Sequence, residues 1–204
     1  MKRVIIKIGT KILTTPKNKL DLNNLRRLVC EISYLIKQHE LECILVSSGS
    51  IISGAEELNI TPTTMPEKQA SASVGQLLLL NEYHQFFSQN SIKIGQILLT
   101  KDIFQDSTKK TNVLNTITAL LKHNVMPIIN ENDTVAVDEI QFGDNDILTS
   151  TIAPLLNAEL VVFLTDTSGV YDKNPMEHSD AKLIPVINHI SDQDINEMPG
   201  SLDS

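Results

Sequence analysis

The chain has 204 residues, of which 41% are hydrophobic and 21% are charged, a composition typical of one soluble globular domain. Its 17 basic and 25 acidic residues give a formal net charge of −8, which argues against a nucleic-acid partner or an anionic membrane surface. No stretch approaches the ~20 consecutive apolar residues of a membrane span. Lys7 also interrupts the N-terminal apolar run before it reaches the ~7–15 residues of a signal peptide. We therefore expect a cytoplasmic protein with no nucleic-acid and no membrane partner.

The predicted secondary structure alternates between strands and helices, with no internal repeat or long linker. In chain order we expect a strand at 4–8, a helix at 21–38, a strand at 43–47 that turns into a helix, a long helix at 67–90, a strand at 92–99, a helix at 109–123, a strand at 125–130, a helix from Ile147 and a strand at 160–165. Pro154 is expected to kink or restart the helix that contains it. This alternation predicts an α/β fold, a three-layer α/β/α sandwich around a mainly parallel sheet.

Polar residues follow four of the predicted strands, at residues 7–10, 47–49, 130–133 and 165–166. Ligands of open parallel sheets bind beyond the carboxyl ends of the strands. The sequence therefore predicts that these four clusters converge on one ligand site.

Each cluster has both a functional and an ordinary structural explanation. Lys7 lies inside an apolar strand, where its ammonium needs either an anionic partner or a path to water. Gly9 and Thr10 could offer backbone amides to phosphate. The helix that starts near Ser48 could bind an anion, or Ser48 could simply cap it. Asp146 could orient lysine ammonium groups or magnesium, or it could cap a helix.

The residues give no sign of a metal site, a disulfide or covalent catalysis. Cys30 falls in a helical pattern and Cys43 in a strand pattern with no CxxC motif, so we expect two buried free thiols. The five histidines show no ligand spacing, and no nucleophile elbow occurs. A dinucleotide-binding glycine motif, a P-loop and the protein-kinase signatures are absent as well. A phosphate-binding sheet of another type is needed.

Six segments resemble the amino acid kinase family, and within it the branch that phosphorylates L-glutamate. They are VIIKIGT (4–10), VSSGSIISG (46–54), EKQASASVGQ (67–76), INENDTVA (129–136), FGDND (142–146) and LTDTSGVYDKNP (164–175). The resemblance covers nearly the whole chain. Asn174 stands where the family usually has an aspartate.

The resemblance implies a role for particular residues. Lys7 and Asp146 would be catalytic, with Asp146 positioning the catalytic lysines. Ser48, Asp133 and Asn145 would bind glutamate. ATP would be bound by Lys7, Gly9, Thr10, Thr165 and Asp166.

The implied reaction transfers the γ-phosphoryl group of ATP to the side-chain carboxylate of L-glutamate, giving glutamyl 5-phosphate in the first step of proline biosynthesis. Mg²⁺ would arrive with ATP and be held mainly by its phosphates, with no metal site in the protein. The resemblance also implies a homo-oligomer, with proline as a candidate feedback inhibitor. Another amino acid kinase, acting on carbamate, aspartate or N-acetylglutamate, is the alternative within the fold.

The family's GTGGMxTK-like segment, whose glycines line the nucleotide and whose lysine is catalytic, has no counterpart in residues 1–204. We therefore expect an amino acid kinase domain over 1–204 that is incomplete at its C-terminal end, where the last strands and helices are missing. No RNA-binding-like C-terminal domain is expected. A non-catalytic remnant that binds glutamate or a partner is the alternative from another functional class.

Overall fold

The structure, a computed structural model, describes residues 2–135 and 145–188. It divides into two compact units, Met1–Leu164 and Thr165–Ser204. The first three residues of the FGDND segment and the C-terminal DINEMPGSLDS segment lie outside the described residues.

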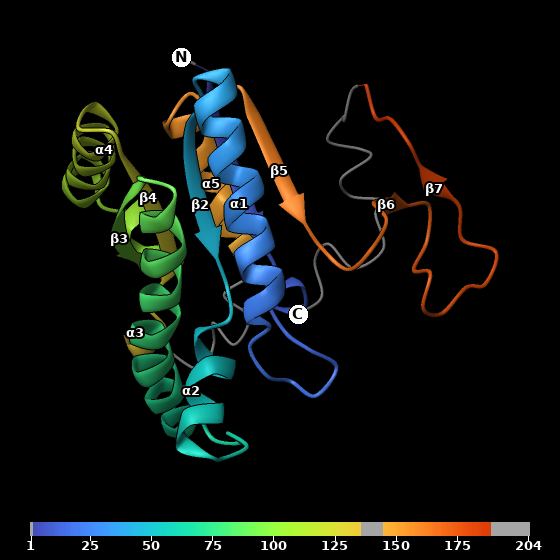
Figure 1. Cartoon of the computed structure of the whole chain (residues 1–204). Coiled ribbons are helices and arrows are strands. Elements are labelled where there is room, and N and C mark those ends of the chain that lie inside the picture. Colours follow the sequence, from blue (N-terminus) through green and yellow to red (C-terminus); the bar gives the residue numbers. More distant parts are fainter. Residues whose placement is uncertain (1, 136–144, 189–204) are drawn as a thin grey trace. The chain divides into compact units, whose positions relative to one another are not determined.

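The first unit contains the predicted alternation of strands and helices (Figure 1). Its strands are β1 (Arg3–Ile8), β2 (Glu42–Ser47), β3 (Lys93–Leu99), β4 (Val125–Glu131) and β5 (Leu160–Leu164). Its α-helices are α1 (Leu22–His39), α2 (Ser50–Leu58), α3 (Met65–Gln89), α4 (Ser107–Lys122) and α5 (Asn145–Leu155). In the second unit, β6 (Val170–Tyr171) pairs with β7 (Leu183–Ile184) in an antiparallel hairpin.

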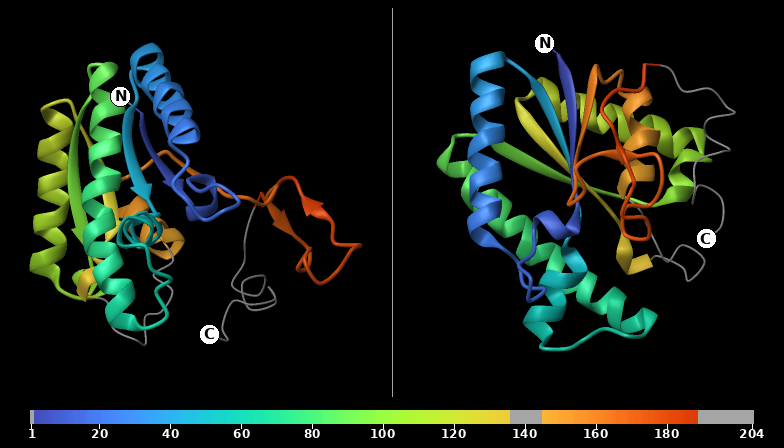
Figure 2. Two further views of the ribbon diagram at one scale, coloured as in Figure 1. Left: turned by 60° about the horizontal axis from the view of Figure 1, so that its bottom comes forward. Right: turned by 90° about the vertical axis from the view of Figure 1, so that its right-hand side faces the viewer.

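The five strands of the first unit form one sheet in the order β3-β4-β2-β1-β5, and every neighbouring pair is parallel. The right-hand view of Figure 2 shows α1 on one side of the strands, with α4 and α5 on the other. The predicted α/β sandwich around a mainly parallel sheet is therefore confirmed.

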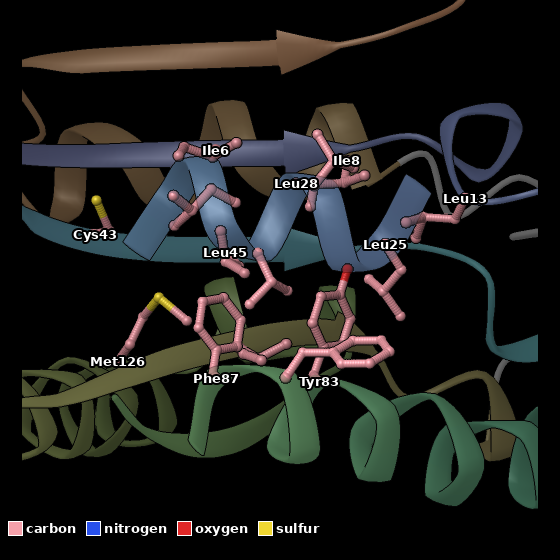
Figure 3. Close-up of a cluster of buried hydrophobic side chains, with 14 of the residues drawn as sticks. Ile6, Ile8, Leu13, Leu25, Leu28, Cys43, Leu45, Tyr83, Phe87 and Met126 are labelled. Carbon is pink, nitrogen blue, oxygen red and sulfur yellow. The ribbon is translucent and has the colours of Figure 1, made fainter. Parts of the chain in front are cut away.

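Side chains of β1 alternate between two cores, one on each face of the sheet. Ile6 and Ile8 pack in the core beneath α1 and α3, whereas Ile5 packs in the core beneath α4 and α5. Figure 3 shows the first core, where Tyr83 and Phe87 of α3 point toward strand residues such as Leu45. Because both faces of the sheet are covered, the central strands β1, β2 and β4 are mainly apolar in the sequence.

Local hydrogen bonds set where the long helix α3 begins. The Thr64 side chain accepts from the Glu67 N–H, and the Glu67 side chain accepts from the Thr64 N–H. This capping box satisfies two donors that the first helical turn leaves without partners. Consequently α3 begins at Met65, two residues before the predicted start.

Two smaller predictions need comment. Cys43 is buried as expected, but Cys30 is exposed, so the prediction of two buried thiols was wrong for Cys30. Cys30 lies in the correctly predicted helix α1, beside the buried Val29 but on the outward-facing side. Pro154 lies inside the last turn of α5, one residue before the helix ends at Leu155.

Helices α2 and α3 cross at two glycines that allow their backbones to touch. A methyl group on Gly54 would lie 1.8 Å from the Ser71 carbonyl oxygen, and one on Gly75 would lie 1.8 Å from the Ser50 carbonyl oxygen. No side chain fits at either position unless the helices move apart. The crossing therefore fixes where the first turn of α2 lies against α3.

We expect Gly54→Ala to destabilise the fold, even though alanine is the better helix former by ~1 kcal/mol. Forcing a side chain into a closely packed contact typically costs ~1–3 kcal/mol, and here the obstacle is backbone. Thermal unfolding of the purified chain measures this loss. Ser73→Ala, at an exposed position of α3, is the control and should leave the midpoint unchanged or raise it. A Gly54→Ala protein as stable as the parent would contradict the close crossing.

Candidate active site at the carboxyl edge of the sheet

A polar cavity of about 120 Å³ lies beyond the carboxyl ends of the central strands, with room for several waters or a small polar molecule. Its polar lining includes the side chains of Thr10, Ser48, Ser50, Asn130, Asp133 and Asn145. These residues lie at or just after the carboxyl ends of β1, β2 and β4 or begin α2 and α5. The edge of the sheet where the sequence places the ligand site is therefore hollow and polar.

Lys7 and Asp146 form an ion pair at this edge. The Lys7 Nζ lies 2.6 Å from Asp146 Oδ1, and the exposed side-chain fractions are 10% and 46%. Because Lys7 is two residues after Ile5 on β1, it faces the same side of the sheet as α5, whose first turn carries Asp146. A largely buried ammonium with a half-exposed carboxylate partner is suited to contact an anionic ligand without first losing its own solvation.

Asp133 is held by the first residue of α2. Ser50 Oγ donates to Asp133 Oδ2 at 3.0 Å. Burial raises the pKa of the Asp133 carboxyl above its ordinary value, and the hydrogen bond from Ser50 opposes that shift. A cationic group bound beside Asp133 would favour its ionised form and so bring the pKa back down.

Asn145 lies at the centre of a hydrogen-bonded group. Its Nδ2 donates to Ser48 Oγ at 2.8 Å, to Asn130 Oδ1 at 3.1 Å and to the Ser47 carbonyl at 3.3 Å. Its Oδ1 is buried, and no described residue donates to it. A buried acceptor without a donor is costly, so the site gains stability when a ligand or water supplies one.

The start of α2 is open to an anion. Gly49 precedes the helix with a φ of 106°, a conformation that glycine adopts readily, and no side chain caps the first turn. Free N–H groups and the helix dipole at such a terminus attract negative charge. Gly9, at the end of β1, also has neighbours close to its Cα: an added methyl group would lie 3.2 Å from the Leu164 carbonyl oxygen and 3.5 Å from Lys7 Nζ.

The structure brings together seven of the nine predicted site residues. Lys7 and Asp146 are paired, Gly9 adjoins Lys7, and the other four, Thr10, Ser48, Asp133 and Asn145, line the cavity. Thr165 and Asp166 open the second unit, and their role at the nucleotide remains a prediction.

Three residues at the site were given no individual role by the sequence, although Asn130 belongs to the predicted cluster 130–133. Ser50 and Asn130 line the cavity, and Gln76 Oε1 accepts from Asn130 Nδ2 at 2.7 Å. Ser50 and Asn130 stand at a helix start and a strand end, the same signals that indicated their neighbours. Gln76 closes the EKQASASVGQ segment but carries no signal of its own that points to the cavity. Among the described residues, no group of three His, Cys, Asp or Glu side chains could hold a metal ion.

The chain is similar to known proteins along most of its length. The amino acid kinase family matches residues 2–201. The chain is 45% identical to a glutamate 5-kinase of Thermoanaerobacter sp. strain X514 over 193 residues, which is 94% of this chain and 52% of that protein. It is 42% identical to a glutamate 5-kinase of Enterococcus faecalis over 205 residues, which is 98% of this chain and 75% of that protein. The chain thus spans about half the length of the first of these relatives.

Solved structures share the fold at low sequence identity. A T. acidophilum isopentenyl phosphate kinase in a product complex superposes with a TM-score of 0.57 and 17% identity, covering 88% of this chain and 77% of that one. An isopentenyl phosphate kinase in a substrate complex gives a TM-score of 0.59 and 18% identity, covering 89% of this chain and 78% of that one. At this identity the likeness concerns the fold alone.

Within the described residues, no helix has the length and apolar character needed to cross a membrane.

Proposed function

This chain belongs to the amino acid kinase family, and on that premise we propose that its site transfers the γ-phosphoryl group of ATP to the side-chain carboxylate of L-glutamate. The observation that carries the proposal is the Lys7–Asp146 pair beside a small polar cavity. Relatives that share 40–45% of its residues are named glutamate 5-kinases. The product, glutamyl 5-phosphate, would feed proline biosynthesis.

This phosphoryl transfer requires the protein mainly to position the two substrates and to supply positive charge. A carboxylate is already a nucleophile, so no general base is needed to activate it. Phosphoryl transfer spreads negative charge over the migrating group, and fixed cations that face that charge lower the barrier. We assign this task to the Lys7 ammonium, held in place by Asp146 at 2.6 Å.

Mg²⁺ fits this site as a companion of the nucleotide. It usually binds one or two protein carboxylates together with substrate phosphates and several waters. Asp146, whose side chain is 46% exposed, is the carboxylate here that could reach it. The ion would supply further positive charge to the phosphates. Gly9 and Thr10 at the end of β1 would approach ATP through their backbone amides, and Thr165 and Asp166 would complete the nucleotide site.

The cavity offers complementary groups to a free amino acid. The Asp133 carboxylate and the buried Asn145 Oδ1 are acceptors suited to an ammonium group. The uncapped first turn of α2 is suited to a carboxylate. We therefore assign the glutamate site to Ser48, Asp133 and Asn145.

Isothermal titration calorimetry with L-glutamate, L-aspartate and N-acetyl-L-glutamate tests the substrate. L-glutamate should bind most tightly, because aspartate is one methylene shorter, and acetylation removes the charged ammonium that the acceptors of the cavity would receive. The loss for N-acetylglutamate should be the larger, since its single uncharged amide N–H cannot serve both buried acceptors. Equal or tighter binding of either competitor would overturn the assignment to glutamate and favour another acid within the family.

A further inference from the structure

Two amide side chains that line the cavity, Asn130 and Asn145, are joined with Gln76 in a chain of hydrogen bonds. One backbone group fixes the direction of that chain. The Glu131 N–H, which can only donate, donates to Asn130 Oδ1 at 2.9 Å. The Asn130 oxygen therefore faces Glu131, and its Nδ2 must face the other way. That nitrogen donates to Gln76 Oε1 at 2.7 Å and to Ser50 Oγ at 3.4 Å, so both of its protons have acceptors.

The same direction passes on to Asn145. Because Asn130 Oδ1 is an acceptor, Asn145 must present its Nδ2 to it, which it does at 3.1 Å. The same nitrogen donates to Ser48 Oγ at 2.8 Å. Ser48 thus accepts from the protein, and no described residue takes the proton of its hydroxyl. The Ser48 hydroxyl is left as a donor at the wall of the cavity.

The backbone contact between α2 and α3 places Gln76 at the end of this chain of amides. Gly75 packs against the Ser50 carbonyl so closely that a methyl group there would overlap it. The next residue, Gln76, consequently lies beside Ser50 and Asn130 rather than in the solvent. The accepting oxygen of Gln76 stabilises the one orientation of Asn130 that the Glu131 N–H also requires.

We propose that Gln76 is a positioning residue for the ligand site: by accepting from Asn130, it holds Asn145 and Ser48 in the orientation in which the Ser48 hydroxyl donates to a carboxylate of the bound amino acid. This inference rests on the proposed function, since the ligand is taken to be L-glutamate. Gln76 itself touches no ligand in this scheme and acts through Asn130.

The test is a double-mutant cycle read by calorimetry with L-glutamate at pH 8. Gln76→Met keeps the length of the side chain but removes the acceptor, and should weaken binding about tenfold, as expected for one buried donor left without a partner. Gln76→Glu restores an acceptor and should recover most of that loss. Gln85→Met, at an exposed position of the same helix, is the matched control.

The cycle separates positioning from general destabilisation. In a Ser48→Ala background, Gln76→Met should cost less than about twofold, because the hydroxyl through which it acts is gone. Gln76→Asn, which withdraws the acceptor from Asn130 while keeping an amide, is the second test variant and should behave like Gln76→Met. Thermal midpoints of all variants show that the compared proteins are folded.

Two outcomes would overturn the inference in distinguishable ways. Binding of L-glutamate by the parent chain, with the Gln76 variants unchanged or with losses additive to Ser48→Ala, would exclude the positioning role and leave the proposed function standing. A parent chain that binds no L-glutamate would overturn the proposed function, and this inference with it.

Discussion

Replacing Lys7 by alanine should lower glutamate-dependent ADP release by at least ~10²–10³-fold, the usual cost of losing one positioned cation or donor in a transition state. The protein for this measurement joins residues 1–204 to the part of the Enterococcus faecalis relative that follows the matched stretch, which covers 75% of that relative. The size of the effect follows from burial. The Lys7 side chain is 10% exposed and its Nζ lies 2.6 Å from Asp146 Oδ1. A cation from solution therefore cannot readily take the place of the missing ammonium.

A matched lysine distinguishes this loss from a general change in charge. Lys2 is exposed and directly precedes β1, and Lys2→Ala should leave the rate within about twofold, as is usual for an exposed charge. Lys7→Arg should not restore activity, because a planar guanidinium cannot reproduce the point charge of an ammonium in a buried space. A Lys7→Ala protein that keeps more than about a tenth of the parent rate would contradict the assignment.

The fold was predictable from the sequence because both of its periodicities are strong. A strand covered on both faces is mainly apolar, as residues 4–8 and 43–47 are apart from Lys7 and Ser47, and α1 shows its buried stripe at helical spacing. The polar residues at the ends of the strands were equally visible. The prediction that they share one ligand site followed from the rule that ligands bind at the carboxyl edge of a parallel sheet. Residues such as Lys7, Ser48 and Asp133 could therefore be found without coordinates.

What the sequence could not supply was the contact between helices. Whether Gln76 reaches Asn130 depends on the crossing of α2 and α3 at Gly54 and Gly75, which no periodicity encodes. Ser50 was visible at a helix start, but its bond to Asp133 joins residues 83 positions apart. The prediction that Cys30 is buried was wrong for a related reason. Cys30 follows the buried Val29, and a shift of one position around α1 decides whether a side chain faces the core or the solvent.

A preparation of residues 1–204 alone should show little or no glutamate-dependent ADP release, whereas the extended protein should show it. The resemblance to the family implies two lysines that flank the migrating phosphoryl group, with a carboxylate between them. The described residues supply one of these lysines, Lys7, together with the carboxylate of Asp146. The glycine-rich GTGGMxTK-like segment with the second lysine does not occur in residues 1–204, and the extension is chosen to provide it.

Binding and turnover should respond differently to the extension. On the proposed assignment, L-glutamate binding needs only the cavity lined by Ser48, Asp133 and Asn145, all within residues 1–204, so its affinity should change by less than about tenfold. ATP affinity and turnover should both rise, since the added glycine-rich loop would contact the nucleotide, and a second positioned cation is worth ~10²–10³-fold in rate. Asp146→Ala in the extended protein should then remove most of the gain. Robust turnover by residues 1–204 alone would contradict this account, because some other cation in the chain would have to replace the second lysine.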